Sequence, residues 1–405
     1  MSLYSRIQRS SRDLLTFAGA SLILGIAYSM YDSVFNNFLN ETYALTGFQR
    51  SFLEFPRELP GFLVVFVAAL LLFWGSRRLS VFSILLSAVG VLLIAVAAPS
   101  YTIMLLWMFV YSLGQHLFMP LQATIGMELA SEGRAGRRLG QLNAIRNFAN
   151  ILGSFLVLLG FRYLGFNFRV TFLIAAFILF IAAALLYNLK PDQPGKRKFL
   201  ELHREYNLYY ALMVLAGARK QLFITFAPWV LVTIFGQPTQ IIATLLTISG
   251  IIGVAFQPML GWAIDHYGER RVMAAEALIL IGVCFGYGFA RSLLPERTAF
   301  LVVCFCYLVD QMIFSVSMAR STYMKKIARQ PDHIQSTLTA GVTIDHIFSI
   351  SCALVGGVIW NRLGFQYVFL FGMLIAVINF FTALRVHLPG EPAAPTGLAE
   401  VPAKA

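Results

Sequence analysis

The stretch Tyr163-Leu164-Gly165-Phe166, which ends a helix-length apolar segment, returns later in the chain as Arg362-Leu363-Gly364-Phe365. The offset is 199 residues, from 165 to 364, and the same offset carries Arg146 onto Asp345. A long fixed offset of this kind indicates an internal duplication, and ionisable residues inside duplicated apolar segments are typical of membrane transporters.

Composition places the chain in a membrane. Hydrophobic residues make up 58% of the 405 residues, charged residues only 12%, and the mean hydropathy is +0.73. Soluble domains carry roughly 25% charged residues, and a helical span needs about 20 apolar residues. We therefore predict an all-α integral membrane protein with twelve transmembrane helices in two pseudo-symmetric six-helix bundles. The predicted spans are 14–39, 47–74, 79–98, 101–128, 138–162, 168–189, 208–236, 239–264, 272–290, 298–323, 334–360 and 365–386.

The longest polar break divides these spans six and six. It contains two prolines, a glycine and the run Lys196-Arg197-Lys198. The predicted domains are an N-terminal bundle over 1–189, a cytoplasmic linker over 190–206, a C-terminal bundle over 207–388 and a disordered tail over 389–405. Arg6, Arg9 and Arg12 precede the first span without a cleavage signal, which favours an uncleaved first helix.

The formal charge of +12 is distributed unevenly. Of the 31 lysines and arginines, 20 flank the spans on the side of both predicted termini and 5 flank them on the other side. This asymmetry follows the positive-inside rule and predicts cytoplasmic termini in a cytoplasmic (inner) membrane. The charge therefore indicates contact with lipid rather than a nucleic-acid partner, and we expect a monomer.

One loop carries a family-level motif. Between the eighth and ninth spans stands Gly261-Trp-Ala-Ile-Asp265-His-Tyr-Gly268-Glu-Arg270-Arg271. This stretch resembles the G-x-x-x-D-x-x-G-x-R-R/K signature of the major facilitator superfamily. We expect Gly261 to allow close helix approach, Gly268 to form the tight turn, and Asp265 to cap a helix beside the arginines.

The other half matches the same family less closely. After the second span it has only Gly75-Ser-Arg-Arg78, without the aspartate, while Glu128 with Arg134, Arg137, Arg138 and Gly140 looks like the family's connection between spans four and five. The resemblance covers the whole chain in topology and implies alternating access between two bundles, with spans one, four, seven and ten around a central cavity. Motifs of drug antiporters, sugar porters and peptide transporters are missing, so no subfamily is identified.

Four charged residues share one face of the second predicted span: Arg50, Glu54, Arg57 and Glu58. Two interpretations stay open. Either the four form a self-neutralising ladder that fixes packing, or one carboxylate carries a proton because burial disfavours its charged form.

Span eleven adds Asp345 and His346. Counting 1.5 Å per residue places Asp345 at the depth of Arg57, and we hypothesise that the two pair across the moving interface, with Glu54 or Glu58 competing for the arginine. The alternative is that Asp345 and His346 satisfy each other or nearby backbone. Together the second-span residues and this pair are the predicted proton-coupling set.

The predicted substrate site draws on the spans around the cavity. Asp310 and Arg219 are the first choice for direct contact, although Arg219 and Lys220 instead snorkel if the long seventh span places them near its cytoplasmic end. The further lining residues are Tyr31, Asp32, Asn36, Gln115 and His116. A lone His116 is more often a packing residue. Arg146 among asparagines favours a wet cavity and suits carboxylate or phosphate recognition.

These residues predict a secondary active transporter of a small organic anion, coupled to protons. The alternatives are an exporter of amphipathic compounds, for which a large aromatic cavity would be the sign, and a transporter-like membrane sensor. The chain has no His-rich cluster, nucleotide loop or Ser-His-Asp spacing, so we predict no enzyme activity, cofactor or metal. Cys284, Cys304, Cys306 and Cys352 all lie within spans and indicate neither disulfides nor a metal site.

Overall fold

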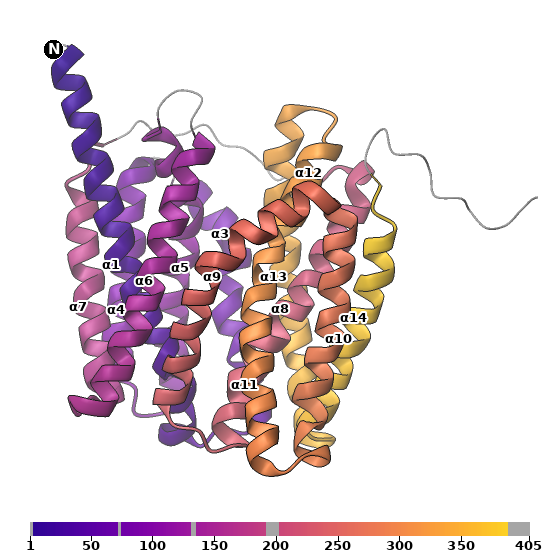
Figure 1. The fold of residues 1–405 in the computed structure, drawn as a ribbon. Coiled ribbons are helices and arrows are strands. Elements are labelled where there is room, and N and C mark those ends of the chain that lie inside the picture. The colour runs from indigo at the N-terminus through magenta and orange to yellow at the C-terminus, as the bar shows by residue number, and fades with distance from the viewer. Residues whose placement is uncertain (1–2, 72–73, 131–134, 192–201, 388–405) are drawn as a thin grey trace, which may run out of the picture.

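The computed structural model describes residues 3–71, 74–130, 135–191 and 202–387. In these ranges every regular element is a helix (Figure 1). The first half contains α1 (Leu3–Tyr43), α2 (Gly47–Phe52), α3 (Glu54–Leu71), α4 (Gly75–Val96), α5 (Tyr101–Glu128), α6 (Ala135–Tyr163) and α7 (Phe168–Tyr187). The predicted tail, 389–405, and most of the predicted linker lie outside the described residues.

The second half begins with the short η2 (Arg204–Tyr206). It continues through α8 (Asn207–Thr233), α9 (Thr239–Tyr267), α10 (Glu269–Leu293), α11 (Glu296–Ile313), η3 (Phe314–Val316), α12 (Ser317–Ile327), α13 (Pro331–Arg362) and α14 (Phe365–Leu384). Ten segments of the described chain are long and apolar enough to cross a membrane. The two further members of the bundle, α2–α3 and α8, contain the ion-pair residues described below. The twelve-helix membrane architecture is therefore confirmed.

Two of the predicted spans are not continuous helices. The second span is divided at Leu53 into α2 and α3, and the tenth is interrupted by η3 between α11 and α12. The division at Leu53 lies within the charged stretch, between Arg50 and Glu54. A break in a membrane helix is tolerated where protein, rather than lipid, surrounds the freed backbone groups, and both breaks adjoin the central cavity.

The duplicated Leu-Gly-Phe stretches perform the same task in each half. Gly165 and Gly364 have φ angles of +67° and +113°, in the region that only glycine adopts without strain. Each lies between a long helix that ends and the next that begins, α6 to α7 and α13 to α14. The local sequence thus fixes two equivalent reversals of the chain.

Each half has its own apolar core. In the first half Phe17, Phe172 and Val91 are fully buried. In the second half Phe226, Phe369 and Leu280 occupy the corresponding interior. We call the end at which α7 ends and α8 begins the linker end, which is the upper end in Figure 1, and the other the opposite end.

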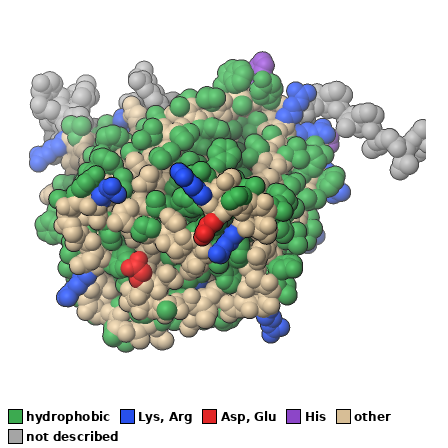
Figure 2. Space-filling model, turned by 60° about the horizontal axis from the view of Figure 1, so that its bottom comes forward, with side chains coloured by type: hydrophobic (Ala, Val, Ile, Leu, Met, Phe, Trp, Pro, Cys, Tyr) green, Lys and Arg blue, Asp and Glu red, His purple; other side chains and the backbone are tan. Residues whose placement is uncertain are grey.

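The halves are joined through α6 with α9 and through α13 with α2 and α3. At the opposite end the amide of Asn37 donates to the Gln237 carbonyl at 2.9 Å, and the backbone N–H of Phe48 donates to Asn361 at 3.1 Å. Gly47 packs so closely on Trp360 that a Cβ atom would overlap the indole. Seen obliquely from this end, the surface is mostly hydrophobic or uncharged (Figure 2).

α6 and α9 contact each other across the interface between the halves. At mid-depth Ser154 and Thr247 hydrogen-bond at 2.9 Å, and Gly250 lies against Ile151. Nearer the linker end, a Cβ atom at Gly140 or Gly261 would have no neighbour within 4 Å. The expectation that Gly261 permits a close helix approach is therefore wrong. The halves are closed against each other at the opposite end.

Candidate functional site

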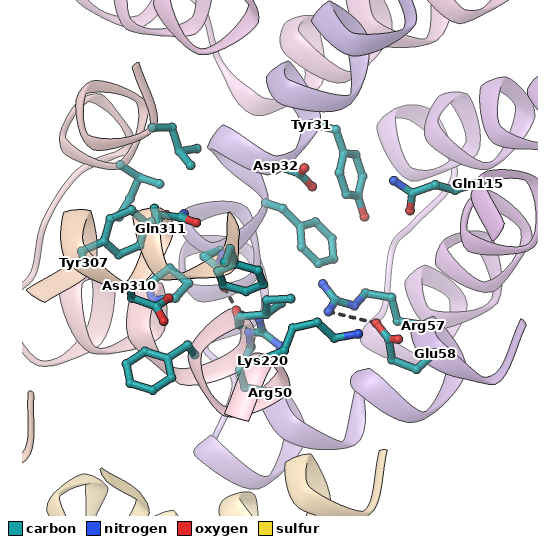
Figure 3. A pocket seen from close by; sticks show the side chains of 18 of the residues that line it. Tyr31, Asp32, Arg50, Arg57, Glu58, Gln115, Lys220, Tyr307, Asp310 and Gln311 are labelled. Carbon is teal, nitrogen blue, oxygen red and sulfur yellow. Dashed lines mark hydrogen bonds and ion pairs between the residues drawn. The ribbon is translucent and has the colours of Figure 1, made fainter. Parts of the chain in front are cut away.

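A cavity of about 350 Å³ lies between the two halves. Its wall is formed by α1, α2, α3 and α5 of the first half and by α8, α9, α11, η3 and α13 of the second. Six predicted substrate residues line it: Tyr31, Asp32, Asn36, Gln115, His116 and Asp310. Figure 3 shows these walls converging on one space from both halves.

Asp32 is the free carboxylate of this cavity. Its side chain is exposed to the cavity space, and within the described part of the chain no side chain or backbone group hydrogen-bonds or ion-pairs with it. Beside it, the buried hydroxyls of Tyr31 and Tyr111 also have no hydrogen-bond partner among the residues that the structure describes. Their rings pack at 4.4 Å between centroids. One acceptor and two hydroxyls are thus available to a solute or to water.

Aromatic rings form much of the remaining wall. Tyr31 and Phe35 stack at 4.8 Å, and Phe223, Tyr307 and Phe314 face them from the second half. Gln115 and Gln311 add amide groups. Such a wall combines flat apolar surfaces with a few polar groups that orient a ligand.

The ion-pair ladder of α2 and α3 consists of Arg50, Glu54, Arg57 and Glu58. Glu54 accepts a hydrogen bond from Arg50 and forms an ion pair with Arg57, each at 2.6 Å, and Arg57 also donates to Glu58 at 3.2 Å. Arg50 is 1% exposed, and its guanidinium also donates to Asn36 of α1 and to the Ile224 carbonyl of α8. The ladder is self-neutralising and connects the two halves.

Arg57 and Asp345 do not pair, contrary to the hypothesis from depth. Asp345 accepts from Lys220 of α8 at 2.5 Å, whereas Arg57 is held by the two glutamates of its own helix. Counting residues along the sequence predicts the depth of a side chain but not the rotation of its helix. Asp345 pairs with α8 because α8 packs against α13 more closely than α3 does. Glu54 and Glu58, the expected competitors of Asp345, are the residues that pair with Arg57.

His346, next to Asp345, points instead toward the first half. Its Nδ1 lies 2.8 Å from Glu58 Oε2, so this contact joins α13 to α3 across the interface. The alternative in which Asp345 and His346 satisfy each other is also wrong. Figure 3 shows Lys220 extending toward Arg57 and Glu58 from the other half.

Arg219 is a structural ion-pair partner rather than a cavity residue. It is 3% exposed, donates to Asp310 at 2.9 Å and lies 3.9 Å from Glu276. Glu276 in turn accepts from Arg320 at 2.8 Å. Arg219 therefore does not contact a ligand directly in this structure, and burial inside α8 excludes snorkelling. Lys220, about 100° further round the helix, is the residue that enters the cavity.

Arg146 is exposed on α6 and does not line the cavity. Its neighbour Asn147 donates to Gln257 of α9 at 3.2 Å. Asn147 and Gln257 line a second pocket of about 210 Å³, which shares Asp32, Leu246 and Gln311 with the cavity. This polar pocket continues the cavity toward the linker end.

The loop between α9 and α10, which carries the family motif, differs from the expectation. Gly268 does form the tight turn, with φ +82°, and it is the residue that precedes α10. Asp265 is not a helix cap, because α9 continues to Tyr267 and places Asp265, which is exposed, in its last turn. Arg270 is half-buried and Arg271 exposed at the start of α10.

In the first half an arginine of the corresponding loop pairs with acidic residues of other helices. Arg77 lies 3.1 Å from Asp13 of α1 and 4.0 Å from Glu128 of α5. The corresponding corner of the second half has Glu269 with Lys326 at 2.7 Å. Neither Asp13 nor the Glu269–Lys326 pair was singled out from the sequence.

Sequence reasoning also missed Glu276, Arg320 and Tyr307. Glu276 lies in an otherwise apolar segment, and this isolation in a predicted span was the signal available for it. It also missed that His116 lies beside His346, with ring centroids 5.1 Å apart. The two histidines belong to different helices, α5 and α13, so no spacing in the sequence predicts their contact.

A family model described as the Major Facilitator Superfamily matches residues 17–344. Among solved structures, the nucleoside transporter NupG is similar with TM-score 0.72 at 14% identity, covering 92% of this chain and 98% of that one. A D-xylose-proton symporter matches with TM-score 0.71 at 15% identity, covering 93% and 97%.

A third similar structure is described as a bacterial homolog to human lysosomal transporter Spinster, in an inward-facing and occupied conformation. Its TM-score is 0.65 at 16% identity, covering 93% of this chain and 97% of that one. At these identities the likeness concerns the fold.

Proposed function

This chain belongs to the major facilitator superfamily, and on that premise we propose that it is a proton-coupled secondary transporter of a small polar solute that carries hydrogen-bond donors. The observation that carries the proposal is Asp32, an unpaired carboxylate in a cavity between two halves. An ionised side chain within a bilayer costs about 2.5–3.5 kcal/mol or more. A proton or a donor group of the solute removes that cost.

The closure at the opposite end supports alternating access. The cavity is sealed there by contacts between α2 and α13 and continues through the second pocket toward the linker end. We place the linker end in the cytoplasm, following the excess of lysine and arginine. The structure then corresponds to a state whose cavity is closed to the outside.

The prediction of an anionic solute depended on basic residues that the structure places in ion pairs or outside the cavity. It rested on three arginines: Arg57 and Arg219 are paired with carboxylates, and Arg146 lies outside the cavity. The free charge facing the cavity is negative. We therefore propose an uncharged or cationic solute with a ring that packs on Tyr31 and Phe35.

Proton coupling through the ladder residues, Asp345 and His346 also stays a prediction. Each of these carboxylates has a cationic or imidazole partner, whereas Asp32 has none among the described residues. This difference supports Asp32 as the site where a proton and the solute alternate.

The test begins with identification of a solute. Protein reconstituted in liposomes is screened by counterflow with uridine, xylose, a primary amine and a dicarboxylate, the first two being the solute classes of the similar transporters. With the solute that exchanges, wild-type protein should accumulate it under an inward pH gradient, and a protonophore should abolish the accumulation.

The variant Asp32→Asn then tests the mechanism. It should keep counterflow but lose accumulation driven by the pH gradient, because an amide cannot carry the proton. Glu296→Gln, an exposed carboxamide change at the start of α11, is the matched control and should behave as wild type. Normal accumulation by Asp32→Asn would overturn the coupling proposal, and exchange of the dicarboxylate alone would overturn the proposed solute class.

The aromatic wall also favours the second candidate, an exporter of amphipathic compounds. Tyr31, Phe35, Tyr111, Phe223, Tyr307 and Phe314 all line the cavity. Binding of a hydrophobic cation, tetraphenylphosphonium, with no exchange of uridine, xylose or the amine would favour that function.

A further inference from the structure

Three potential metal ligands from both halves lie close together in the wall of the cavity. Glu58 comes from α3, His116 from α5 and His346 from α13, and one ligand atom from each lies within 4.8 Å of the other two. Their exposed fractions are 7%, 8% and 6%, and all three line the cavity. A carboxylate with two imidazoles is a donor set that Zn²⁺ and similar ions prefer.

Hydrogen bonding fixes which nitrogen of His116 is free. The Ser112 hydroxyl donates to the Arg57 carbonyl, so its single proton is already used. His116 Nδ1 lies 2.9 Å from the Ser112 carbonyl and 3.0 Å from the hydroxyl oxygen, and must therefore be the donor. In the neutral imidazole of His116, Nε2 then carries no proton and its lone pair can bind an ion. Metal-binding histidines are oriented by this kind of backbone contact.

Gly61 gives the two rings room to converge. A Cβ atom at this position would lie 2.8 Å from His116 Cδ2, the carbon beside Nε2, and 2.9 Å from His346 Nδ1. The free edge of His116 and the Nδ1 edge of His346 thus face the same point on α3. Any larger residue at Gly61 would separate them.

The carboxylate of Glu58 is oriented by its neighbours and can still coordinate an ion. Its Oε1 accepts from Arg57, and its Oε2 lies 2.8 Å from His346 Nδ1. In a tetrahedral site with bonds of 2.0–2.1 Å, neighbouring ligand atoms are about 3.3 Å apart. An ion that replaces the proton between Oε2 and Nδ1 therefore requires a separation of only about 0.5 Å. Glu54 offsets the charge of Arg57 on the other side.

We propose that Glu58, His116 and His346 bind one divalent transition-metal ion, with Zn²⁺ as the representative. The fourth coordination position faces the cavity. Because α13 supplies one ligand and α3 and α5 supply two, the ion binds only when the halves are together at this level. This site goes beyond the proposed solute transport and does not depend on it.

A second group at the linker end provides an internal control. His203, Glu205 and His333 are also close together, but the two imidazoles stack face to face at 3.9 Å. Both Glu205 oxygens are in ion pairs, with Arg329 at 3.0 Å and with His333 at 3.3 Å. Stacked rings direct their lone pairs side by side rather than at one ion, so this group is not expected to bind.

The experiment uses full-length protein in detergent, with any affinity tag removed, titrated with Co²⁺ and then with Zn²⁺ as competitor. One Co²⁺ per chain should give the visible d–d bands of a four- or five-coordinate site. His116→Gln and His346→Gln should each weaken binding by at least about 100-fold, since even outer-shell partners contribute about 10–100-fold. His203→Gln and His333→Gln should bind as wild type.

Unchanged Co²⁺ affinity in both cavity variants would overturn the proposal, as would loss of binding in the linker-end variants alone. A measurement on the wild-type protein avoids dependence on how the variants fold. X-ray absorption fine structure of the Zn²⁺-loaded protein should give two imidazole ligands and otherwise oxygen. Sulfur ligands, or fewer than two imidazoles, would contradict the assignment whatever the variants do.

Discussion

Lys220 Nζ and Asp345 Oδ2 lie 2.5 Å apart, joining α8 to α13 inside the second half. The pair is partly buried, with 26% and 12% of the two side chains exposed, and the ammonium lines the cavity. Gly217 is packed so tightly on the aspartate that a Cβ atom there would overlap it. The second half therefore neutralises this interfacial charge with a residue of its own.

The first prediction concerns this pair. Asp345→Asn leaves Lys220 without its counter-charge and should lower the free energy of unfolding by about 2 kcal/mol, less than the 3–5 kcal/mol of fully buried pairs. Adding Lys220→Gln should recover part of the loss, because the remaining groups are both neutral. Denaturant titration in mixed micelles measures both variants. Additive losses in the double variant would mean that the two residues are not coupled.

A larger effect is expected at Glu276. Its side chain is 1% exposed and neutralises Arg320 at 2.8 Å and, with Asp310, Arg219. Glu276→Gln leaves buried positive charge uncompensated and should lower the free energy of unfolding by about 3 kcal/mol. Glu296→Gln, at an exposed position at the start of α11, is the matched control. Equal stability of the two variants by the same titration would show that Glu276 does not hold this network.

The closure at the opposite end depends on small residues. A Cβ atom at Gly357 would lie 2.6 Å from Ser51 Cβ and 3.3 Å from Phe48 Cα, so Gly357→Leu should push α13 away from α2. Hydrogen–deuterium exchange of α2 and of the end of α13 should become faster. Gly282→Leu, at a position where a Cβ atom has no neighbour within 4 Å, should leave exchange unchanged. Protection equal to wild type in Gly357→Leu would contradict the role of this glycine in the closure.

The second pocket predicts the route of the solute. Gly253 lines this pocket, and a Cβ atom there would meet nothing within 4 Å. Gly253→Phe should therefore fill the pocket without disturbing its walls, so counterflow should fall at least about tenfold while thermal stability stays within about 0.5 kcal/mol of wild type. Gly282→Phe serves as the control. Full counterflow in Gly253→Phe would place the route elsewhere.

The sequence predicted the membrane fold well because its signals are local. Apolar runs of span length, the polar break after Lys190 and the two Leu-Gly-Phe reversals each report on their own segment. The cavity residues Asp32 and Gln115 were found in the same way, as polar groups isolated in apolar spans. The same reasoning placed Arg219 in the cavity, where the structure has it buried against Asp310.

The sequence by itself determined that twelve helices cross a membrane in two repeated sets, because hydrophobic length and glycine-dependent turns are properties of short stretches of chain. Only the tertiary structure decided which charges are paired. Adjacent residues on a helix point about 100° apart, so Arg219 joins Asp310 while Lys220 joins Asp345, and Asp345 faces its own half while His346 reaches Glu58 of the other. Rotation and packing of the helices determine these partners. They also leave Asp32 as the carboxylate that faces the cavity without a partner among the described residues.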